Sequence, residues 1–95
     1  MAKYKLTNEA KNDLIRIHHY GVIKFGLVQA DKYFEAFFEY FSTIANQPFS
    51  FESVDYIKEG YRRCFCGVDS IFFKINGDIV EIIAIIGRQN VNEEL

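Results

Sequence analysis

Two apolar runs, residues 70–75 and 79–86, constrain the fold most, because both are rich in Ile, Val and Phe and lie close together in the sequence. Between them stands Asn76-Gly77-Asp78, whose Asn-Gly pair tolerates the positive φ of a tight turn. Short β-forming runs on either side of such a turn are typical of an antiparallel hairpin. The sequence therefore predicts a β-hairpin over residues 70–86.

The side chains of this hairpin sort into two faces, since residues two apart in a strand point the same way. One face is uniformly apolar and is predicted to face the core; it comprises Ile71, Phe73, Ile75, Val80, Ile82, Ala84 and Ile86. The other face comprises Phe72, Lys74, Ile79, Glu81 and Ile83. Two turns remain open, because a loop at residues 76–77 sets Phe72 opposite Glu81, whereas one at residues 77–78 sets Lys74 opposite Glu81 in a favourable pair.

Residues 61–66 alternate in character and predict a third strand, joined to the hairpin by a turn at residues 67–69. This strand carries both cysteines of the chain, Cys64 and Cys66, on one face, where a mutual disulfide is geometrically unfavourable. Cys-x-Cys without further Cys or a nearby His offers a metal only two ligands. We expect two buried, reduced thiols and no metal or cofactor.

The N-terminal part of the chain predicts one short strand followed by a helix. Residues 3–6 alternate lysine with apolar side chains, as in an outer strand whose lysines face water. Thr7 is a suitable helix N-cap, and apolar side chains recur three or four residues apart over residues 8–25. Gly26 then suits the end of this helix.

A second helix is predicted to follow at once and to run to about Asn46, ahead of Pro48. So short a joint makes the two helices an antiparallel hairpin. Four apolar side chains of the second helix can face the sheet, namely Phe34, Phe37, Phe41 and Ile44, whereas Tyr33, Phe38 and Tyr40 spread around it. Either the first helix covers these extra aromatic residues, or they form a surface that binds a helix of a partner.

The elements together predict a single α+β domain over residues 1–95, in the order β-α-α-β-β-β, with a helical hairpin packed on a small, mostly antiparallel sheet. Residues 47–59 lack a sustained period and are expected to form a loop. A net charge of −2 excludes the broadly basic surface that is typical of nucleic-acid binders. No apolar run suits a signal peptide or a membrane helix, so we expect a cytoplasmic protein.

A series of short motifs follows the order of these elements along the chain. They are Tyr4-x-Leu6-Thr7-x-x-Ala10-x-x-Asp13-Leu14-x-x-Ile17, Phe25-Gly26-x-x-Gln29-Ala30-x-x-Tyr33, Phe41-x-x-Ile44-Ala45-x-x-Pro48, Gly60-Tyr61-Arg62-Arg63, Ser70-Ile71-Phe72-Phe73 and Ile85-Ile86-x-Arg88. In this order the set resembles the ParE toxins of bacterial toxin–antitoxin pairs, within the wider RelE/ParE group. The resemblance implies a toxin that a ParD-like antitoxin neutralises.

The resemblance leaves three functions open. RelE-type members cleave mRNA on the ribosome with basic residues on the sheet and a tyrosine near the C-terminus; Arg62 and Arg88 match two basic positions, but no Tyr, His or Lys follows Arg88. ParE-like members inhibit DNA gyrase by trapping it on cleaved DNA and need no active site, so gyrase inhibition is the favoured function. The third possibility is a family member that only binds its antitoxin.

Candidate binding residues follow from the same resemblance. Those for the target or a partner are Arg62, Arg63, Arg88, Gln89 and Asn90, although Gly87 stands where the family commonly has a basic or aromatic residue. Those facing the antitoxin are Tyr33, Phe38, Tyr40 and Tyr61. The antitoxin is expected to wrap the helical hairpin and the sheet, with its acidic side chains meeting one of the paired arginines.

The paired arginines and the two histidines also have structural interpretations. Arg62 and Arg63 lie on opposite faces of one strand, so one of them is expected to pair with an acidic side chain of the chain itself. His18 and His19 stand in the first helix without a nucleophile or a good metal set nearby, and we expect both to be surface or partly buried helix residues.

Overall fold

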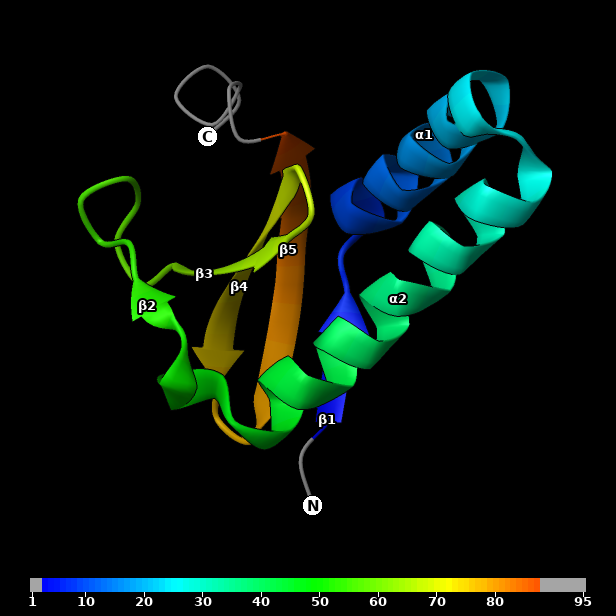
Figure 1. Cartoon of the computed structure of the whole chain (residues 1–95). Helices are drawn as coiled ribbons and strands as arrows, with labels where there is room; N and C mark the ends of the chain where they lie inside the picture. The colour runs from blue at the N-terminus through cyan, green and yellow to red at the C-terminus, as the bar shows by residue number, and fades with distance from the viewer. Residues whose placement is uncertain (1–2, 88–95) are drawn as a thin grey trace.

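Two helices lie across one face of a five-stranded sheet in the computed structural model, which describes residues 3–87 (Figure 1). The elements in chain order are β1 (Lys3–Leu6), α1 (Asn8–Phe25), α2 (Leu27–Asn46), the 3₁₀ helix η1 (Pro48–Ser50), β2 (Glu52–Ser53), β3 (Arg62–Cys66), β4 (Asp69–Asn76) and β5 (Ile79–Gly87). The strand order is β1-β5-β4-β3-β2, with β1 parallel to β5 and all other pairs antiparallel. The predicted α+β architecture is confirmed.

Local signals set the bounds of both helices as predicted. The hydroxyl oxygen of Thr7 caps α1 by accepting a hydrogen bond from the Ala10 N–H at 3.1 Å. At the other end Gly26 has a φ of 91° and donates its N–H to the Val22 carbonyl at 3.0 Å. Since this glycine both ends α1 and precedes α2, the helices fold back on one another.

The β4–β5 hairpin has the turn at residues 77–78, which is the second of the two registers considered. Asn76 pairs with Ile79, and Lys74 lies opposite Glu81. Gly77 supplies the positive φ of the turn, 66°. The turn between β3 and β4 is likewise short, because Cys66 pairs directly with Asp69.

A β-bulge in β5 changes which side chains face the helices. Phe73 pairs with Ile82 but Phe72 pairs with Ala84, so Ile83 is an extra residue in the ladder. The prediction that Ala84 and Ile86 lie in the core beneath the helices is therefore wrong. Both belong to a second apolar cluster on the opposite face, and Ile85 packs under the helices instead, since one inserted residue reverses the alternation.

The segment predicted as a loop, residues 47–59, also contains regular structure. It holds η1 and the two-residue strand β2, in which Glu52 pairs with Arg63 and Ser53 with Arg62. The sheet accordingly gains an edge strand that the sequence did not predict, because two residues carry no period. The other edge strand, β1, is as expected, with its lysines exposed and Tyr4 and Leu6 packed against the core.

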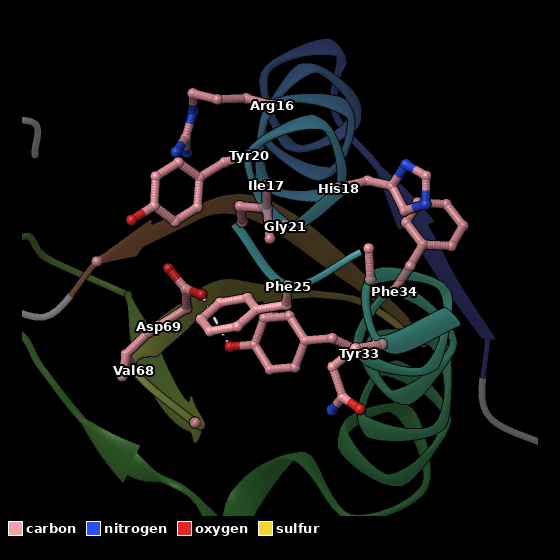
Figure 2. Close-up of a pocket in the computed structure, with 14 residues that line it drawn as sticks. Arg16, Ile17, His18, Tyr20, Gly21, Phe25, Tyr33, Phe34, Val68 and Asp69 are labelled. Atoms are coloured by element: carbon pink, nitrogen blue, oxygen red, sulfur yellow. Dashed lines mark hydrogen bonds between the residues drawn. The ribbon is translucent and has the colours of Figure 1, made fainter. Parts of the chain in front are cut away.

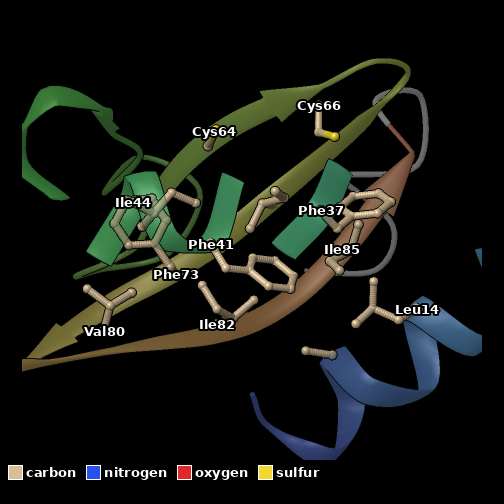
Figure 3. Packing of buried hydrophobic residues seen from close by; sticks show 12 residues of the cluster. Leu14, Phe37, Phe41, Ile44, Cys64, Cys66, Phe73, Val80, Ile82 and Ile85 are labelled. Atoms are coloured by element: carbon tan, nitrogen blue, oxygen red, sulfur yellow. The ribbon is translucent and has the colours of Figure 1, made fainter. Parts of the chain in front are cut away.

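The main core lies between the helices and the sheet (Figure 3). Its buried residues are Ala10, Leu14, Phe37, Phe41, Ile44, Cys64, Cys66, Ile71, Phe73, Val80, Ile82 and Ile85. The smaller cluster on the opposite face comprises Val54, Phe72, Ala84 and Ile86. Both cysteines are buried and reduced, as predicted, and burial raises the pKa of each thiol to about 11. Neither helix is long and apolar enough to cross a membrane.

Candidate functional site

The free end of the helical hairpin projects past the sheet (Figure 1). A groove of about 560 Å³ lies between this end and the sheet, and Figure 2 shows its lining. The lining side chains come from both helices, from the β3–β4 turn and from the end of β5. They include Ile17, Tyr20, Phe25, Ala30, Tyr33, Phe34, Val68, Asp69 and Gly87. A largely apolar hollow with a few polar groups is typical of a site that binds another molecule.

The tip of the hairpin, which we define as residues 20–28, is strongly apolar and open to solvent. Ile23 and Val28 are 74% and 71% exposed, and Tyr20, Phe25 and Leu27 are also exposed. Phe25, the last residue of α1, is 63% exposed because this end of the helix projects past the sheet. Contiguous apolar side chains of this kind mark protein contacts.

Tyr33 links α2 to the sheet at the floor of the groove. Its hydroxyl lies 2.8 Å from the Cys66 carbonyl oxygen and 2.8 Å from Asp69 Oδ2. Burial, followed by the hydrogen bond to Asp69, raises the pKa of Tyr33 well above its usual value, so the hydroxyl keeps its proton. Gly67 allows this approach, because it has a φ of +60° and an added Cβ would stand 2.9 Å from the tyrosine oxygen.

The wall of the groove beside β5 is held by two side chains of α1. Strand β1 ends at Leu6, opposite Ile82, and beyond it α1 side chains reach the β5 backbone. Asp13 Oδ2 accepts a hydrogen bond from the Ile85 N–H at 2.9 Å. Arg16 donates to the Ile85 carbonyl at 3.2 Å and to Asp13 at 3.3 Å. Sequence reasoning missed this pair, and its spacing of three residues within a helix was the available signal.

Arg63, on the face of the sheet away from the helices, is engaged within its own chain. It donates to Glu52 from Nε and Nη2, at 3.2 and 3.1 Å, and to the Tyr56 hydroxyl at 3.2 Å. Its guanidinium also lies 4.8 Å from the centre of the Phe65 ring. The prediction that one of the two arginines forms an internal ion pair is confirmed.

Arg62 is also engaged, on the opposite face. It donates to the Phe51 carbonyl at 2.7 Å and lies 5.0 Å from the centre of the Phe49 ring. The two arginines therefore do not converge on one point. The remaining target-binding candidates, Arg88, Gln89 and Asn90, lie outside the described residues.

The four residues predicted to face the antitoxin occupy different places. Tyr33 lines the groove, whereas Phe38 packs edge-on against Phe34 and Phe41. Tyr40 is 37% exposed on α2, away from the groove lining. Tyr61 packs against the second cluster, on the far face of the sheet. Of the four, the structure places only Tyr33 in a groove shared by the helices and the sheet.

The first helix contacts α2 at Phe34, one of the four side chains that were expected to face the sheet. His18 of α1 stacks edge-on against Phe34, with ring centres 5.3 Å apart. Its Nε2 lies 2.7 Å from Asp31 Oδ1. His18 is partly buried and His19 is exposed, in agreement with the prediction. Within residues 3–87 no group of three or more His, Cys, Asp or Glu side chains is placed to hold a metal ion.

The fold is shared with proteins of toxin–antitoxin systems. A chain of the chromosomal ParDE system from P. aeruginosa superposes with a TM-score of 0.81 at 21% identity, covering 92% of this chain and 96% of that one. A chain of the toxin–antitoxin complex RelBE2 from Mycobacterium tuberculosis gives a TM-score of 0.70 at 15% identity, covering 92% and 98%. Both likenesses establish the fold class, a small α+β domain with a helical hairpin on a mostly antiparallel sheet.

Sequence comparison then identifies the family. The family model described as "ParE toxin of type II toxin-antitoxin system, parDE" matches residues 4–91. Toxin ParE1 of Caulobacter vibrioides is 33% identical over 92 residues, which cover 97% of this chain and 94% of that protein. The chain belongs to the ParE family of type II toxins, as its resemblance predicted.

Proposed function

We propose that this ParE toxin acts in the cytoplasm by binding DNA gyrase, and that a ParD-like antitoxin neutralises it by occupying the groove. Membership of the ParE family supports the choice of gyrase, because gyrase inhibition is what the resemblance to ParE-like members implies. The inhibition needs no catalytic group of the toxin itself. The proposed activity is therefore protein binding, not an enzymatic reaction.

The state of the two sheet arginines carries the proposal. In the RelE-type alternative, basic residues on the sheet hold and neutralise the scissile phosphate of mRNA. Here Arg63 is paired with Glu52, and Arg62 is held by the Phe51 carbonyl on the opposite face. Arg62 is the one of the two matching basic residues that the structure describes, and binding a phosphate with it would require giving up its hydrogen bond to the Phe51 carbonyl. This arrangement favours a structural role for the pair over phosphate chemistry.

The apolar tip and the groove support an antitoxin site at the free end of the helical hairpin. An amphipathic segment of the antitoxin can place its apolar side chains against Tyr20, Phe25 and Val68, which are exposed in the free toxin. Each Å² of apolar surface that the antitoxin removes from water contributes about 25 cal/mol of favourable free energy. Burial of this kind stabilises a toxin–antitoxin complex.

The test is to add the purified toxin to gyrase, ATP and supercoiled plasmid and to measure double-strand cleavage complexes. We expect cleaved DNA to accumulate, and preincubation with the antitoxin encoded beside the toxin gene to prevent this. Unchanged gyrase activity in the presence of a toxin that still arrests bacterial growth would exclude gyrase as the target.

Inducing the toxin in bacterial cultures tests the alternatives. Cuts in messages at ribosome-bound sites, lost in Arg62→Ala, would establish the RelE-type activity, and the fold alone does not exclude it because the RelBE2 chain shares it. Normal growth together with tight antitoxin binding would instead identify a member that has kept only its antitoxin site.

A further inference from the structure

A buried carboxylate lies at the floor of the groove. Asp69, the first residue of β4, is only 8% exposed, and its side chain points into the groove beside Tyr33 (Figure 2). Its place is fixed by the strand ladder, in which it pairs with Cys66 on one side and Gly87 on the other. Neither the target nor the antitoxin candidates drawn from the sequence include this residue.

The carboxylate is short of hydrogen-bond donors. The Tyr33 hydroxyl is its hydrogen-bond partner at 2.8 Å, but the same hydroxyl lies equally close to the Cys66 carbonyl. A hydroxyl has one hydrogen and serves one of these acceptors at a time. Either the Cys66 carbonyl oxygen or Asp69 Oδ2 is therefore left without the tyrosine proton.

The carboxylate also lacks a counter-charge among residues 3–87, where no ion pair includes Asp69. The two basic side chains that line the groove are committed elsewhere. Arg16 binds Asp13 and the Ile85 carbonyl, and His18 binds Asp31. Removing a carboxylate from water without a charged partner is unfavourable. The hydrogen bond from the Tyr33 hydroxyl does not supply such a partner, because the hydroxyl is neutral. The negative charge is thus available to a cation that arrives from outside.

We propose that Asp69 and Tyr33 form a receptor for one basic side chain, arginine or lysine, carried by the antitoxin segment that fills the groove. The charged end binds the carboxylate in a charge-assisted hydrogen bond. The apolar stem packs on the rings of Tyr33 and Phe25 at the mouth of the groove. The source of the side chain rests on the proposed function, whereas the preference for a cation rests on the groove alone.

Asp69 thus prefers a basic side chain of the antitoxin, whereas acidic antitoxin side chains were expected at the paired arginines. One internal source must also be tested, because Arg88 follows Gly87, the strand partner of Asp69. The experiment therefore uses a probe that contains neither antitoxin nor gyrase. It remains informative whether or not the gyrase proposal holds.

The probe is the peptide acetyl-Leu-Arg-Leu-amide, and its control is the same peptide with citrulline, which has the shape of arginine without the charge. Each is titrated to about 10 mM into the ¹⁵N-labelled toxin and followed by the amide signals of residues 67–69. We expect the arginine peptide to shift these signals and to bind roughly tenfold more tightly than the citrulline peptide. Equal binding of the two peptides, or no binding of either, would overturn the proposal.

Variants locate the charge. In Asp69→Asn, which keeps the shape and an acceptor for Tyr33, the arginine and citrulline peptides should bind equally. In the matched control Asp78→Asn, at the exposed β4–β5 turn, the tenfold difference should persist. A difference that survives Asp69→Asn contradicts the proposal. So does much tighter arginine binding in Arg88→Ala, since it would show that the chain fills the site with its own side chain. If Asp69→Asn does not fold, the two peptides on the unaltered toxin still decide the outcome.

Discussion

The carboxylate of Asp13 accepts a hydrogen bond from the backbone N–H of Ile85 at 2.9 Å, although the two residues are far apart in the sequence. With Arg16, which donates to the carbonyl of the same residue, it gives β5 the hydrogen bonds that a neighbouring strand would otherwise supply. The helix thereby takes over from β1 at the point where the groove begins. The end of β5 is thus held beside the groove without being covered by another strand.

Asp13→Ala is expected to lower the free energy of unfolding by about 1–3 kcal/mol, because it leaves the buried Ile85 N–H without an acceptor. Asp13→Asn should lose less, since its side-chain oxygen can still accept. Urea unfolding followed by circular dichroism measures both. Equal stability of Asp13→Ala and the unaltered protein would show that water replaces the carboxylate at this edge.

The sequence predicted the features that depend on neighbours along the chain. Thr7 and Gly26 set the bounds of α1, and the turn at Gly77 was predicted in two alternative registers, of which the structure has the one with Lys74 opposite Glu81. It did not predict the bulge at Ile83, whose carbonyl accepts a hydrogen bond from the Thr7 hydroxyl at 2.7 Å. That contact joins opposite ends of the chain, and no local pattern reports it.

The candidate site was likewise predicted only in part from the sequence. The sequence named Tyr33, because aromatic residues around a helix suggest a surface, but it gave no sign of Asp69 or of the groove. The groove exists because the free end of the hairpin projects past the sheet, which depends on how the elements are placed in space. The sequence predicted an internal partner for one of the two arginines, and the structure gives one to each, the Phe51 carbonyl for Arg62 and Glu52 for Arg63.

Gly67→Ala should destabilise the toxin more than Gly77→Ala, although both glycines have a positive φ. A Cβ at position 67 would stand 2.9 Å from the Tyr33 oxygen, whereas a Cβ at position 77 meets nothing within 4 Å. We expect losses of about 2–3 kcal/mol and about 1 kcal/mol respectively in the free energy of unfolding. Thermal and urea unfolding provide the comparison.

The double variant Gly67→Ala/Tyr33→Phe separates the clash from the backbone strain. Removing the hydroxyl opens the space that the new methyl group needs, so the two changes together should be less destabilising than their sum. Strict additivity would mean that the strained φ alone accounts for the loss at position 67.

The two thiols make the stability of the toxin fall at alkaline pH. Burial raises the pKa of Cys64 and Cys66 from 9.0 to about 11, so between these values the unfolded chain gives up protons that the folded chain retains. The cysteine contribution is fully present below pH 9 and is lost as the pH rises towards 11. Urea unfolding across this range should show a steeper decline than in Cys64→Ala/Cys66→Ala, which lacks both thiols. Parallel curves for the two proteins would show that the thiols have the same pKa in both states.

A substitution at the exposed tip of the hairpin should weaken antitoxin binding without changing the stability of the toxin. Phe25→Ser removes an apolar ring that is 63% exposed, and so should change the free energy of unfolding by less than about 0.5 kcal/mol. If the antitoxin covers the tip, the same change should weaken the complex by roughly tenfold or more, which isothermal titration calorimetry measures directly. The matched control is Phe49→Ser, because Phe49 is 73% exposed but stacks on Arg62 at the opposite edge of the sheet. If both variants weaken antitoxin binding equally, the antitoxin wraps the whole domain. If only Phe49→Ser weakens it, the antitoxin binds the β2–β3 edge and the groove is left for another partner.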